Sequence, residues 1–439
     1  MKKSLTKVLS LVLSLIMVIG LVSCNGKSKP SGDNTKKEDV HITWCFWDDL
    51  TATKDLMTKG YKDVIDRFNA ADNGYHCDVI TTNLEEYDSK MAALIAKGEI
   101  PDVWICNPGP NMDVYVNAGL CYDLTDVLKK DNPDWYNSFT KGIFERMTYN
   151  GKIMAVPTNF AAACCFYNTE IFQKAGVAVP KTFDEMLAAC QKLKDAGYQP
   201  ITCSAGTPWC LSMIAGYLCD RSGGPNNLVG ITKGTNTWSG DPSYTKACEN
   251  LAALAKFFQP SCASDTNDEC VAQFYNEQAA MLVQGSWVIA QVNGANPNFE
   301  SKCGVFQFPA VTGGSDPNRM IVKTDNLLVN KNTKHMDAVV ELLKYFTDDT
   351  AQKYTAEVGG KIPVTSVSVD YDKAPKQLSF VMDILSKMTG SLGFYNESLA
   401  SVEAGDTFDN AMVSIALGQK NVKDALAGLD QWYKDNVWK

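Results

Sequence analysis

The stretch Gly151-Lys-Ile-Met-Ala-Val-Pro-Thr-Asn-Phe-Ala-Ala-Ala-Cys-Cys-Phe-Tyr-Asn168 decides the fold of this chain. It follows Asn150, and Asn-Gly is typical of a tight turn because glycine adopts a positive φ without steric cost. Pro157 interrupts strand hydrogen bonding, and the eleven residues after it in this stretch carry no charge. The run Phe160–Tyr167 is small and apolar, as in a strand buried on both faces. This pattern fits an ordinary strand at the centre of a sheet. It also fits the interpretation we favour, a strand that crosses from one lobe to another near residues 158–161.

Three strand-like segments separated by helical patterns precede this stretch. The segments are His41–Trp47, Cys77–Thr82 and Pro101–Cys106, and the residues between them carry apolar side chains at helical spacing. The order strand, helix, strand, helix, strand is the signature of right-handed βαβ units, so it predicts a mostly parallel sheet.

The elements after the stretch predict a second lobe and two further crossings. Thr182 and Glu185 have the spacing of a capping box, which marks the start of a helix, and a strand begins at Ile201. We interpret Cys303–Pro309 as the strand that returns to the first lobe and Val358–Pro363 as a third crossing.

Short motifs follow one another in a characteristic order from about Ile42 to Trp438. Besides the opening stretch they are Gly98-Glu-Ile-Pro-Asp-Val103, Ala118-Gly-Leu120, Pro180-Lys-Thr182, Ala279-Ala-Met281, Gly285-Ser-Trp287, Gly304-Val305 with Pro309, and Ile362-Pro363. In their order and spacing the chain resembles family 1 of the bacterial extracellular solute-binding proteins, the sugar-binding group that includes maltose-binding protein. The resemblance implies the type II periplasmic-binding fold, an α/β architecture of two lobes with mainly parallel sheets and a ligand cleft between them. It also implies delivery of a solute to the permease subunits of an ABC importer.

The crossings, taken with this resemblance, predict the domain organisation. The N-terminal lobe is expected to comprise residues 40–158 and 305–360, and the C-terminal lobe residues 159–304 and 361–439. Such a receptor is expected to act as a monomer.

The N-terminus has the pattern of an export signal. Three lysines precede the apolar run Val8–Val22, which has the length of a signal-peptide core and is too short for a comfortable membrane span. Leu21-Val-Ser-Cys24 resembles a lipobox, which implies cleavage after residue 23 and a lipid on Cys24. Residues 25–39 are mostly polar and small, so they predict a flexible tether. The mature protein is therefore expected on the extracytoplasmic face of the cell membrane; a plain signal peptide with a chance cysteine is the alternative.

The charge of the chain argues against a nucleic-acid partner. The net charge is −9 and no basic block occurs, so nucleic acid is not an expected partner.

Fourteen cysteines remain besides Cys24, but they contain no Cys-x-x-Cys motif and many occupy apolar strand or helix positions. We therefore predict mostly free thiols; Cys203 with Cys210 or Cys219, and Cys262 with Cys270, are the pairs that leave a disulfide open.

No enzyme signature is found in the sequence. It has no glycine-rich phosphate-binding loop, and its three histidines, His41, His76 and His335, are too scattered to suggest a metal site or a catalytic triad. Asp48 and Asp49 are adjacent, whereas a glycosidase needs carboxyl groups that face each other across a bond. We therefore expect a non-enzyme without catalytic residues, metal or cofactor, and a surface glycosidase remains a remote alternative.

Aromatic and amide side chains at strand ends are the candidate ligand contacts. A sugar ring presents a flat face of C–H groups and a rim of hydroxyls, so its sites combine aromatic platforms with polar acceptors. We select nine residues that follow strands or flank the crossing: Trp47, Asp48, Asp49, Asn107, Asn159, Phe160, Trp209, Trp287 and Tyr395. Glu85, Tyr87 and Phe394 are weaker candidates.

The expected function is thus a lipid-anchored receptor that binds a sugar or oligosaccharide and passes it to an ABC importer. The same fold with a peptide, a polyamine or an amino-acid derivative as ligand is the main alternative. A cationic ligand needs several carboxylates around it, whereas a sugar needs platforms, and the aromatic loops favour a sugar.

Overall fold

The computed structural model describes residues 40–51 and 54–438. The predicted signal peptide, the lipidation site Cys24 and the tether lie outside these residues. Among the residues described, none of the helices has the length and apolarity needed to cross a bilayer.

The N-terminal lobe begins with the predicted βαβ units. Strands β1 (Val40–Phe46), β2 (Tyr75–Thr81) and β3 (Val103–Cys106) pair in parallel in the order β2-β1-β3. The helices of this lobe are α1 (Leu56–Ala70), α2 (Tyr87–Lys97), α3 (Pro110–Asn117), α4 (Pro133–Ser138), α12 (Met336–Thr347) and α13 (Asp349–Glu357). The alternation of strands and helices expected from the apolar pattern is confirmed.

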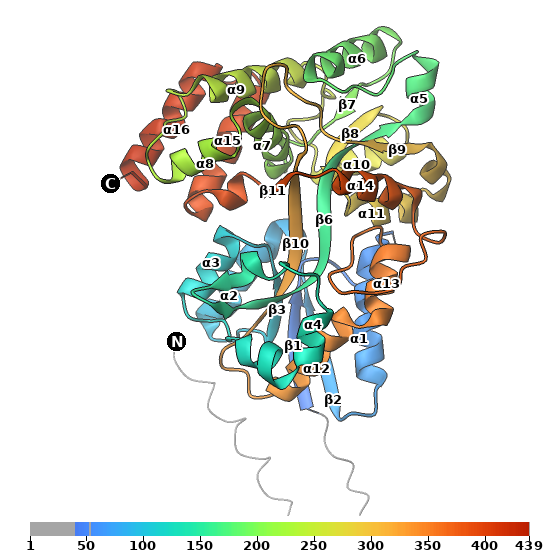
Figure 1. The fold of residues 1–439 in the computed structure, drawn as a ribbon, viewed down its shortest axis with the longest axis vertical. Coiled ribbons are helices and arrows are strands. Elements are labelled where there is room, and N and C mark those ends of the chain that lie inside the picture. The colour runs from blue at the N-terminus through green and yellow to red at the C-terminus, as the bar shows by residue number, and fades with distance from the viewer. Residues whose placement is uncertain (1–39, 52–53, 439) are drawn as a thin grey trace, which may run out of the picture. The chain divides into compact units, whose positions relative to one another are not determined.

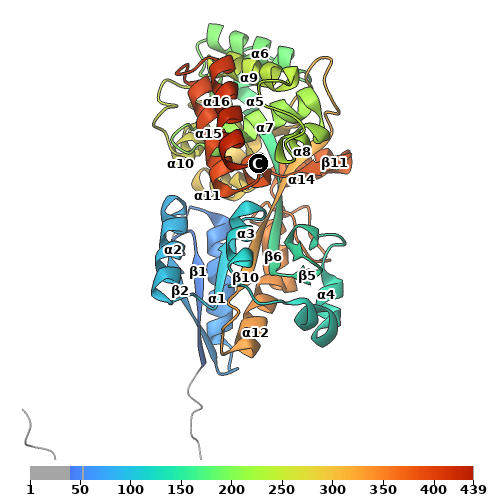
Figure 2. The same ribbon diagram turned by 90° about the vertical axis from the view of Figure 1, so that its left-hand side faces the viewer.

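Two long strands, β6 and β10, join the lobes (Figures 1 and 2). Strand β6 (Ala155–Asn168) is the opening stretch of the sequence analysis, and β10 (Arg319–Val329) pairs with it in antiparallel orientation. The first residues of β6 are buried in the core of the N-terminal lobe, and Ala163 and Cys165 are buried in the core of the C-terminal lobe. The interpretation of this stretch as a crossing strand is therefore confirmed.

A bulge marks the point where the two strands pass between the lobes. Asp325 pairs with Asn159 and Asn326 pairs with Pro157, so Thr158 is the additional residue on β6. The Thr158 hydroxyl donates to the Asp325 carbonyl, 3.2 Å away, and the Thr158 carbonyl accepts from Gln352 Nε2 at 2.8 Å. The interruption expected at Pro157 therefore takes the form of a bulge in a continuous strand.

The C-terminal lobe extends the sheet in the order β10-β6-β8-β7, with β9 paired to β6 and β11 paired to β10. Its own strands are β7 (Ile201–Thr202), β8 (Met281–Gly285), β9 (Cys303–Phe306) and β11 (Gly390–Leu392). Its helices are α5 (Thr169–Lys174), α6 (Phe183–Asp195), α7 (Trp209–Gly223), α8 (Pro225–Thr232), α9 (Pro242–Ala255), α10 (Asn267–Tyr275), α11 (Val288–Ala295), α14 (Lys376–Ser386), α15 (Val402–Ala416) and α16 (Val422–Asn436). The capping box that opens α6 is present as predicted.

The sheet contains both parallel and antiparallel pairs. Strands β1, β2 and β3 pair in parallel, as do β7 with β8 and β10 with β11. Strand β6 is antiparallel to β8, β9 and β10, and β10 is antiparallel to β3. The expectation of mainly parallel sheets is thus wrong for the pairs that β6 forms with β8, β9 and β10 and for β10 with β3, because β10 returns through the sheet in the direction opposite to β6.

Two predicted domain boundaries are corrected by the packing. The segment Cys303–Pro309 does not return to the N-terminal lobe: β9 pairs with the last residues of β6, and Phe306 and Phe308 lie in the C-terminal core. The return crossing is β10, further along the chain. The third crossing also comes later than residue 361, because Val364 is buried in the N-terminal core and its carbonyl accepts from the Thr140 amide at 2.8 Å. The chain enters the C-terminal lobe between Ser366 and α14.

The turn that opens the crossing stretch is formed as predicted. Strands β4 (Thr148–Tyr149) and β5 (Lys152–Ile153) make a short hairpin, and the two residues between them, Asn150 and Gly151, have φ values of 50° and 81°. This left-handed conformation explains the Asn-Gly pair in the sequence.

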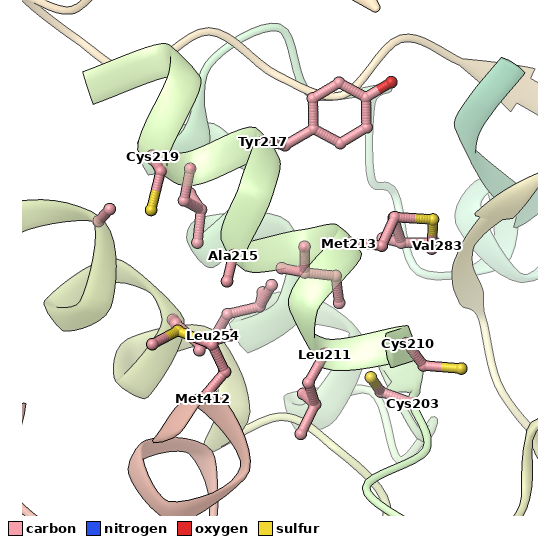
Figure 3. Close-up of a cluster of buried hydrophobic side chains, with 14 of the residues drawn as sticks. Cys203, Cys210, Leu211, Met213, Ala215, Tyr217, Cys219, Leu254, Val283 and Met412 are labelled. Atoms are coloured by element: carbon pink, nitrogen blue, oxygen red, sulfur yellow. The ribbon is translucent and has the colours of Figure 1, made fainter. Parts of the chain in front are cut away.

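The fourteen cysteines after Cys24 are free thiols buried in the cores of the two lobes. Figure 3 shows Cys203, Cys210 and Cys219 among the apolar side chains around α7. Burial raises the pKa of these thiols; for Cys190 the pKa rises to about 12. The prediction of mostly free cysteines is confirmed, and the sulfur atoms fill space in the core as small apolar groups.

Candidate functional site

Three aromatic side chains of the C-terminal lobe form a cluster close to the crossing. Trp209 is the first residue of α7, Trp287 follows β8, and Phe394 follows β11. Their ring centroids lie 6.2 Å apart for Trp209 and Trp287, 6.1 Å for Trp209 and Phe394, and 6.0 Å for Trp287 and Phe394. Both tryptophans are only partly buried, which leaves ring surface open. We call Trp209, Trp287 and Phe394 the aromatic cluster.

The position of the Trp287 ring depends on Gly285. A Cβ atom at Gly285 would lie 1.9 Å from a ring carbon of Trp287, so the indole lies directly over the glycine backbone. A close approach of this kind is possible only when residue 285 lacks a side chain. The Gly-Ser-Trp motif therefore fixes the orientation of an aromatic ring.

Lys323 connects the aromatic cluster with the N-terminal lobe. Its Nζ atom lies 5.9 Å from the ring centre of Trp287, 5.6 Å from that of Phe394 and 6.0 Å from that of Trp47. Trp47 follows β1 in the N-terminal lobe, so aromatic rings from both lobes surround one ammonium group. Contacts of this length between a cation and ring faces are attractive.

A buried carboxylate lies next to this ammonium. Glu397 Oε1 is 3.7 Å from Lys323 Nζ, and the Glu397 side chain is 8% exposed. Burial raises the pKa of Glu397, an effect that the positive charges of Lys323 and Arg146 partly offset. In the part of the chain that the structure describes, Glu397 Oε2 is buried without a hydrogen-bond partner.

Beneath the aromatic rings, a polar network stabilises the crossing itself. Asp325 Oδ2 accepts from Lys361 Nζ at 2.9 Å and from Asn159 Nδ2 at 2.9 Å, and Asn159 also donates to the Tyr61 hydroxyl at 2.7 Å. Burial opposes the charge on Asp325, but Lys361 and Lys323 outweigh it and hold its pKa below the ordinary value. Burial likewise raises the pKa of Tyr61 to about 12. The network links segments from four distant parts of the sequence at the hinge between the lobes.

The two candidate aspartates differ in their surroundings. Asp48 is half-buried and accepts from the Thr58 hydroxyl at 2.5 Å and from the Asp49 amide at 2.8 Å. Burial raises its pKa, and the Thr58 hydrogen bond partly offsets that effect. Asp49 is exposed and accepts from the amide and hydroxyl of Thr51, and these hydrogen bonds lower its pKa.

Of the remaining candidate ligand contacts, two are fully buried and two are half-buried. Asn159 and Tyr395 are 1% and 2% exposed, so Asn159 is committed to the crossing network and Tyr395 to packing against α7 and Phe408. Phe160 is half-buried between the two cores and forms an isolated bridge with Ile362. Asn107 is also half-buried, and among the described residues its Oδ1 atom has no hydrogen-bond partner.

The structure also brings together two histidines that the sequence separates. His41 on β1 pairs with His76 on β2, and Asp78 on the same face lies 2.8 Å from His41 Nδ1 and 3.5 Å from His76 Nε2. Their donor atoms lie within 4.8 Å of one another, a spacing that a divalent ion can bridge. The description of the histidines as scattered is therefore wrong for this pair. The trio lies at the start of β1, at the opposite end of that strand from Trp47.

Sequence reasoning did not select Lys323 or Glu397, and it gave Phe394 a lower rank than Trp209 and Trp287, whose rings lie beside it in the structure. The available signal for Lys323 was a lysine that follows the apolar residues Met320, Ile321 and Val322 in β10. A charge at such a position is costly unless it has a partner or a function.

Comparison with known proteins settles the family. The model of the family described as bacterial extracellular solute-binding protein matches residues 54–353, which is most of the chain. The chain belongs to this family. Family members are solute-binding proteins, in agreement with the two lobes joined by β6 and β10.

Individual solute-binding proteins similar to this one differ in what they bind. A multiple sugar-binding protein of Streptococcus mutans is 24% identical over 376 residues, which cover 82% of this chain and 84% of the relative. An sn-glycerol-3-phosphate-binding periplasmic protein of Agrobacterium fabrum is 23% identical over 399 residues, covering 84% and 88% of the two chains. A solved chitin oligosaccharide binding protein superimposes with a TM-score of 0.80 at 22% identity, over 89% of this chain and 98% of that one. The likeness to that structure confirms the two-lobed fold.

Proposed function

We propose that this solute-binding protein captures a saccharide against the aromatic cluster and delivers it to an ABC importer. The observation that carries the proposal is the meeting of Trp209, Trp287 and Phe394 with Trp47 of the opposite lobe around a single site. Aromatic faces suit the C–H faces of sugar rings, and the rims of such sites carry polar groups. The names of the sugar-binding relatives and of the chitin oligosaccharide binding protein support the same ligand class.

Capture between two lobes explains how one binding event becomes a signal to a transporter. A ligand that contacts Trp287 in one lobe and Trp47 in the other stabilises whichever arrangement of the lobes satisfies both contacts. Exclusion of water from such a site strengthens the hydrogen bonds to sugar hydroxyls. The permease subunits then recognise the arrangement that the ligand stabilises.

The chemistry of the site also bears on the alternative ligands. A polyamine or another cationic ligand would have to enter beside Lys323, whose ammonium already lies against three rings. Like charges at short range in a partly dehydrated site repel strongly. Lys323 therefore disfavours a cation.

The proposal includes the cellular setting. A lipid on Cys24 would hold the monomeric receptor on the extracytoplasmic face of the cell membrane, with residues 25–39 as a tether to the lobes. Replacement of Cys24 by alanine is expected to abolish the incorporation of labelled fatty acid into the protein. A C24A variant that still incorporates labelled fatty acid would contradict a lipid at this residue.

A thermal-shift screen against a carbohydrate panel tests the ligand class. A saccharide that binds only the native protein raises Tm by mass action, by an amount that grows with its concentration relative to Kd. We expect at least one mono- or oligosaccharide to raise Tm and to change the tryptophan fluorescence, because two tryptophans lie in the aromatic cluster. If amino acids, peptides or polyamines raise Tm and no saccharide does, the proposal is wrong.

A further inference from the structure

Lys323 is the cation at the centre of the aromatic site. Its side chain is 19% exposed, so most of it is removed from water. An ammonium carries three N–H donors and has no acceptor of its own. The residues described by the structure record no hydrogen bond from Lys323 Nζ, and Glu397 Oε1, at 3.7 Å, is farther than a hydrogen bond reaches. The donors of this ammonium are thus available to a ligand at the aromatic rings.

Lys323 shares its surroundings with two carboxylates, Asp325 and Glu397, and with two other cations, Lys361 and Arg146. Lys361 and Asp325 form a buried pair at 2.9 Å, and the charge of Lys323 also acts on the Asp325 carboxylate. Glu397 lies near both Lys323 and Arg146, and their positive charges act to lower the pKa of its carboxyl group. Arg146 is close to this segment, because a Cβ added at Gly393 would lie 2.8 Å and 2.9 Å from its two terminal guanidinium nitrogens. Glu397 thus lies near two cations, and it makes no hydrogen bond with Lys323 at 3.7 Å.

Three other acidic side chains, Asp48, Asp49 and Asp409, accept hydrogen bonds from groups other than Lys323. Asp48 is bound to the Thr58 hydroxyl and the Asp49 amide, and Asp49 to Thr51. Asp409 lies buried behind the cluster, where it accepts from Asn396 Nδ2 at 3.0 Å, and burial raises its pKa to about 7. A lysine that served only to hold Glu397 would sit within hydrogen-bond distance of that carboxylate, as Lys361 does with Asp325.

We propose that Lys323 contacts the ligand directly and that the ligand is an acidic saccharide, a carbohydrate that carries a carboxylate or a phosphate. The inference rests on the proposed function and specifies the substrate class of the same site. The sugar ring would lie against the aromatic cluster, and an oxygen of the acidic group would accept from Lys323 Nζ. Arg146, at the edge of the site, supplies a second cation within reach of the same group.

Matched pairs of saccharides test the inference. The probes are aldobiouronic acids with their carboxyl-reduced neutral disaccharides, and hexose phosphates with the parent hexoses, titrated by calorimetry into the full mature protein. Charge-assisted hydrogen bonds are about twice as strong as neutral ones. We therefore expect at least one acidic member to bind about tenfold or more tightly than its neutral partner, with an affinity that falls as salt rises. The pair that shows this preference tells a carboxylate from a phosphate.

Variants assign the preference to Lys323. K323Q is expected to lose the preference for the acidic member while it still binds the neutral one, and K323R, which keeps the charge, should retain most of it. K62Q removes an exposed lysine of α1 that pairs with Asp66, so it controls for the change in net charge. A circular-dichroism melt of each variant shows whether it is folded.

The outcomes separate this inference from the proposed function. Equal binding of acidic and neutral members overturns the inference and leaves saccharide binding intact. Failure of every saccharide to bind overturns the proposed function as well. An acidic preference that survives in K323Q overturns the role of Lys323.

Discussion

Replacement of Trp287 by alanine distinguishes a binding role from a packing role. The ring is partly exposed, lies over Gly285 and meets Trp209 and Phe394 at its edges. Burial of one aromatic face under a sugar ring contributes about 1.5–3 kcal/mol from area alone. We therefore expect W287A to weaken saccharide binding about tenfold to a hundredfold.

W287A should lower the free energy of unfolding by less than the replacement of a core tryptophan does. A fully buried tryptophan replaced by alanine costs about 3–5 kcal/mol, whereas Trp287 is partly exposed and its contacts in the free protein include Gly285, Lys323 and two aromatic rings. Urea unfolding should therefore give a W287A variant that is folded and has lost less than that amount.

The assay is calorimetric titration of wild type and W287A with the saccharide that gives the largest thermal shift. W432A is the matched control, because Trp432 is a partly buried tryptophan on α16 outside the aromatic cluster. It should bind like wild type. Normal binding by W287A, or its failure to fold, would refute the binding role of this residue.

Three further predictions concern thiols, chemistry and the hinge. Thiol titration in denaturant without reductant should detect nearly all fourteen buried cysteines, and fewer than about four would indicate a disulfide framework. Chromatography after long incubation should return the bound saccharide unchanged, so steady product formation would favour an enzyme. D325N should destabilise the protein by about 3–5 kcal/mol at neutral pH, because it leaves Lys361 buried and unpaired; K361M in the same chain should relieve part of that loss. The pKa of Asp325 is lower in the folded protein than its ordinary value of 3.8, so the charged Asp325 contributes its full share to the free energy of unfolding above pH 3.8. That share is lost as pH falls through the folded pKa. The free energies of unfolding of wild type and D325N should therefore become equal only in strong acid.

Much of the fold followed from local patterns. The βαβ order, the hairpin at Asn150-Gly151 and the crossing strand β6 were predictable because apolar runs and turn residues act over a few positions. The strand that returns to the N-terminal lobe was not predictable in this way. Strand β9 is short and apolar, whereas β10 is longer and carries Arg319, Lys323 and Asp325 among its apolar residues, but neither local pattern tells which strand leads to the other lobe. That choice depends on pairing with β6, which is a long-range contact.

The candidate site was predictable only in part. Trp47, Trp209 and Trp287 follow strands or begin a helix beside them, and the resemblance to a known family pointed to those loops. Asn159 looked equally suitable, yet its amide is occupied by Tyr61 and Asp325, which are distant in sequence. Lys323 escaped notice because its importance comes from rings on three separate segments.

A crystal structure of the complex with the saccharide selected by the thermal-shift screen is the most direct test of the central claim. The account predicts a sugar ring stacked on Trp287 within the aromatic cluster, in contact with Trp47 of the opposite lobe. A saccharide bound elsewhere, with Trp209, Trp287 and Phe394 left uncovered, would contradict it.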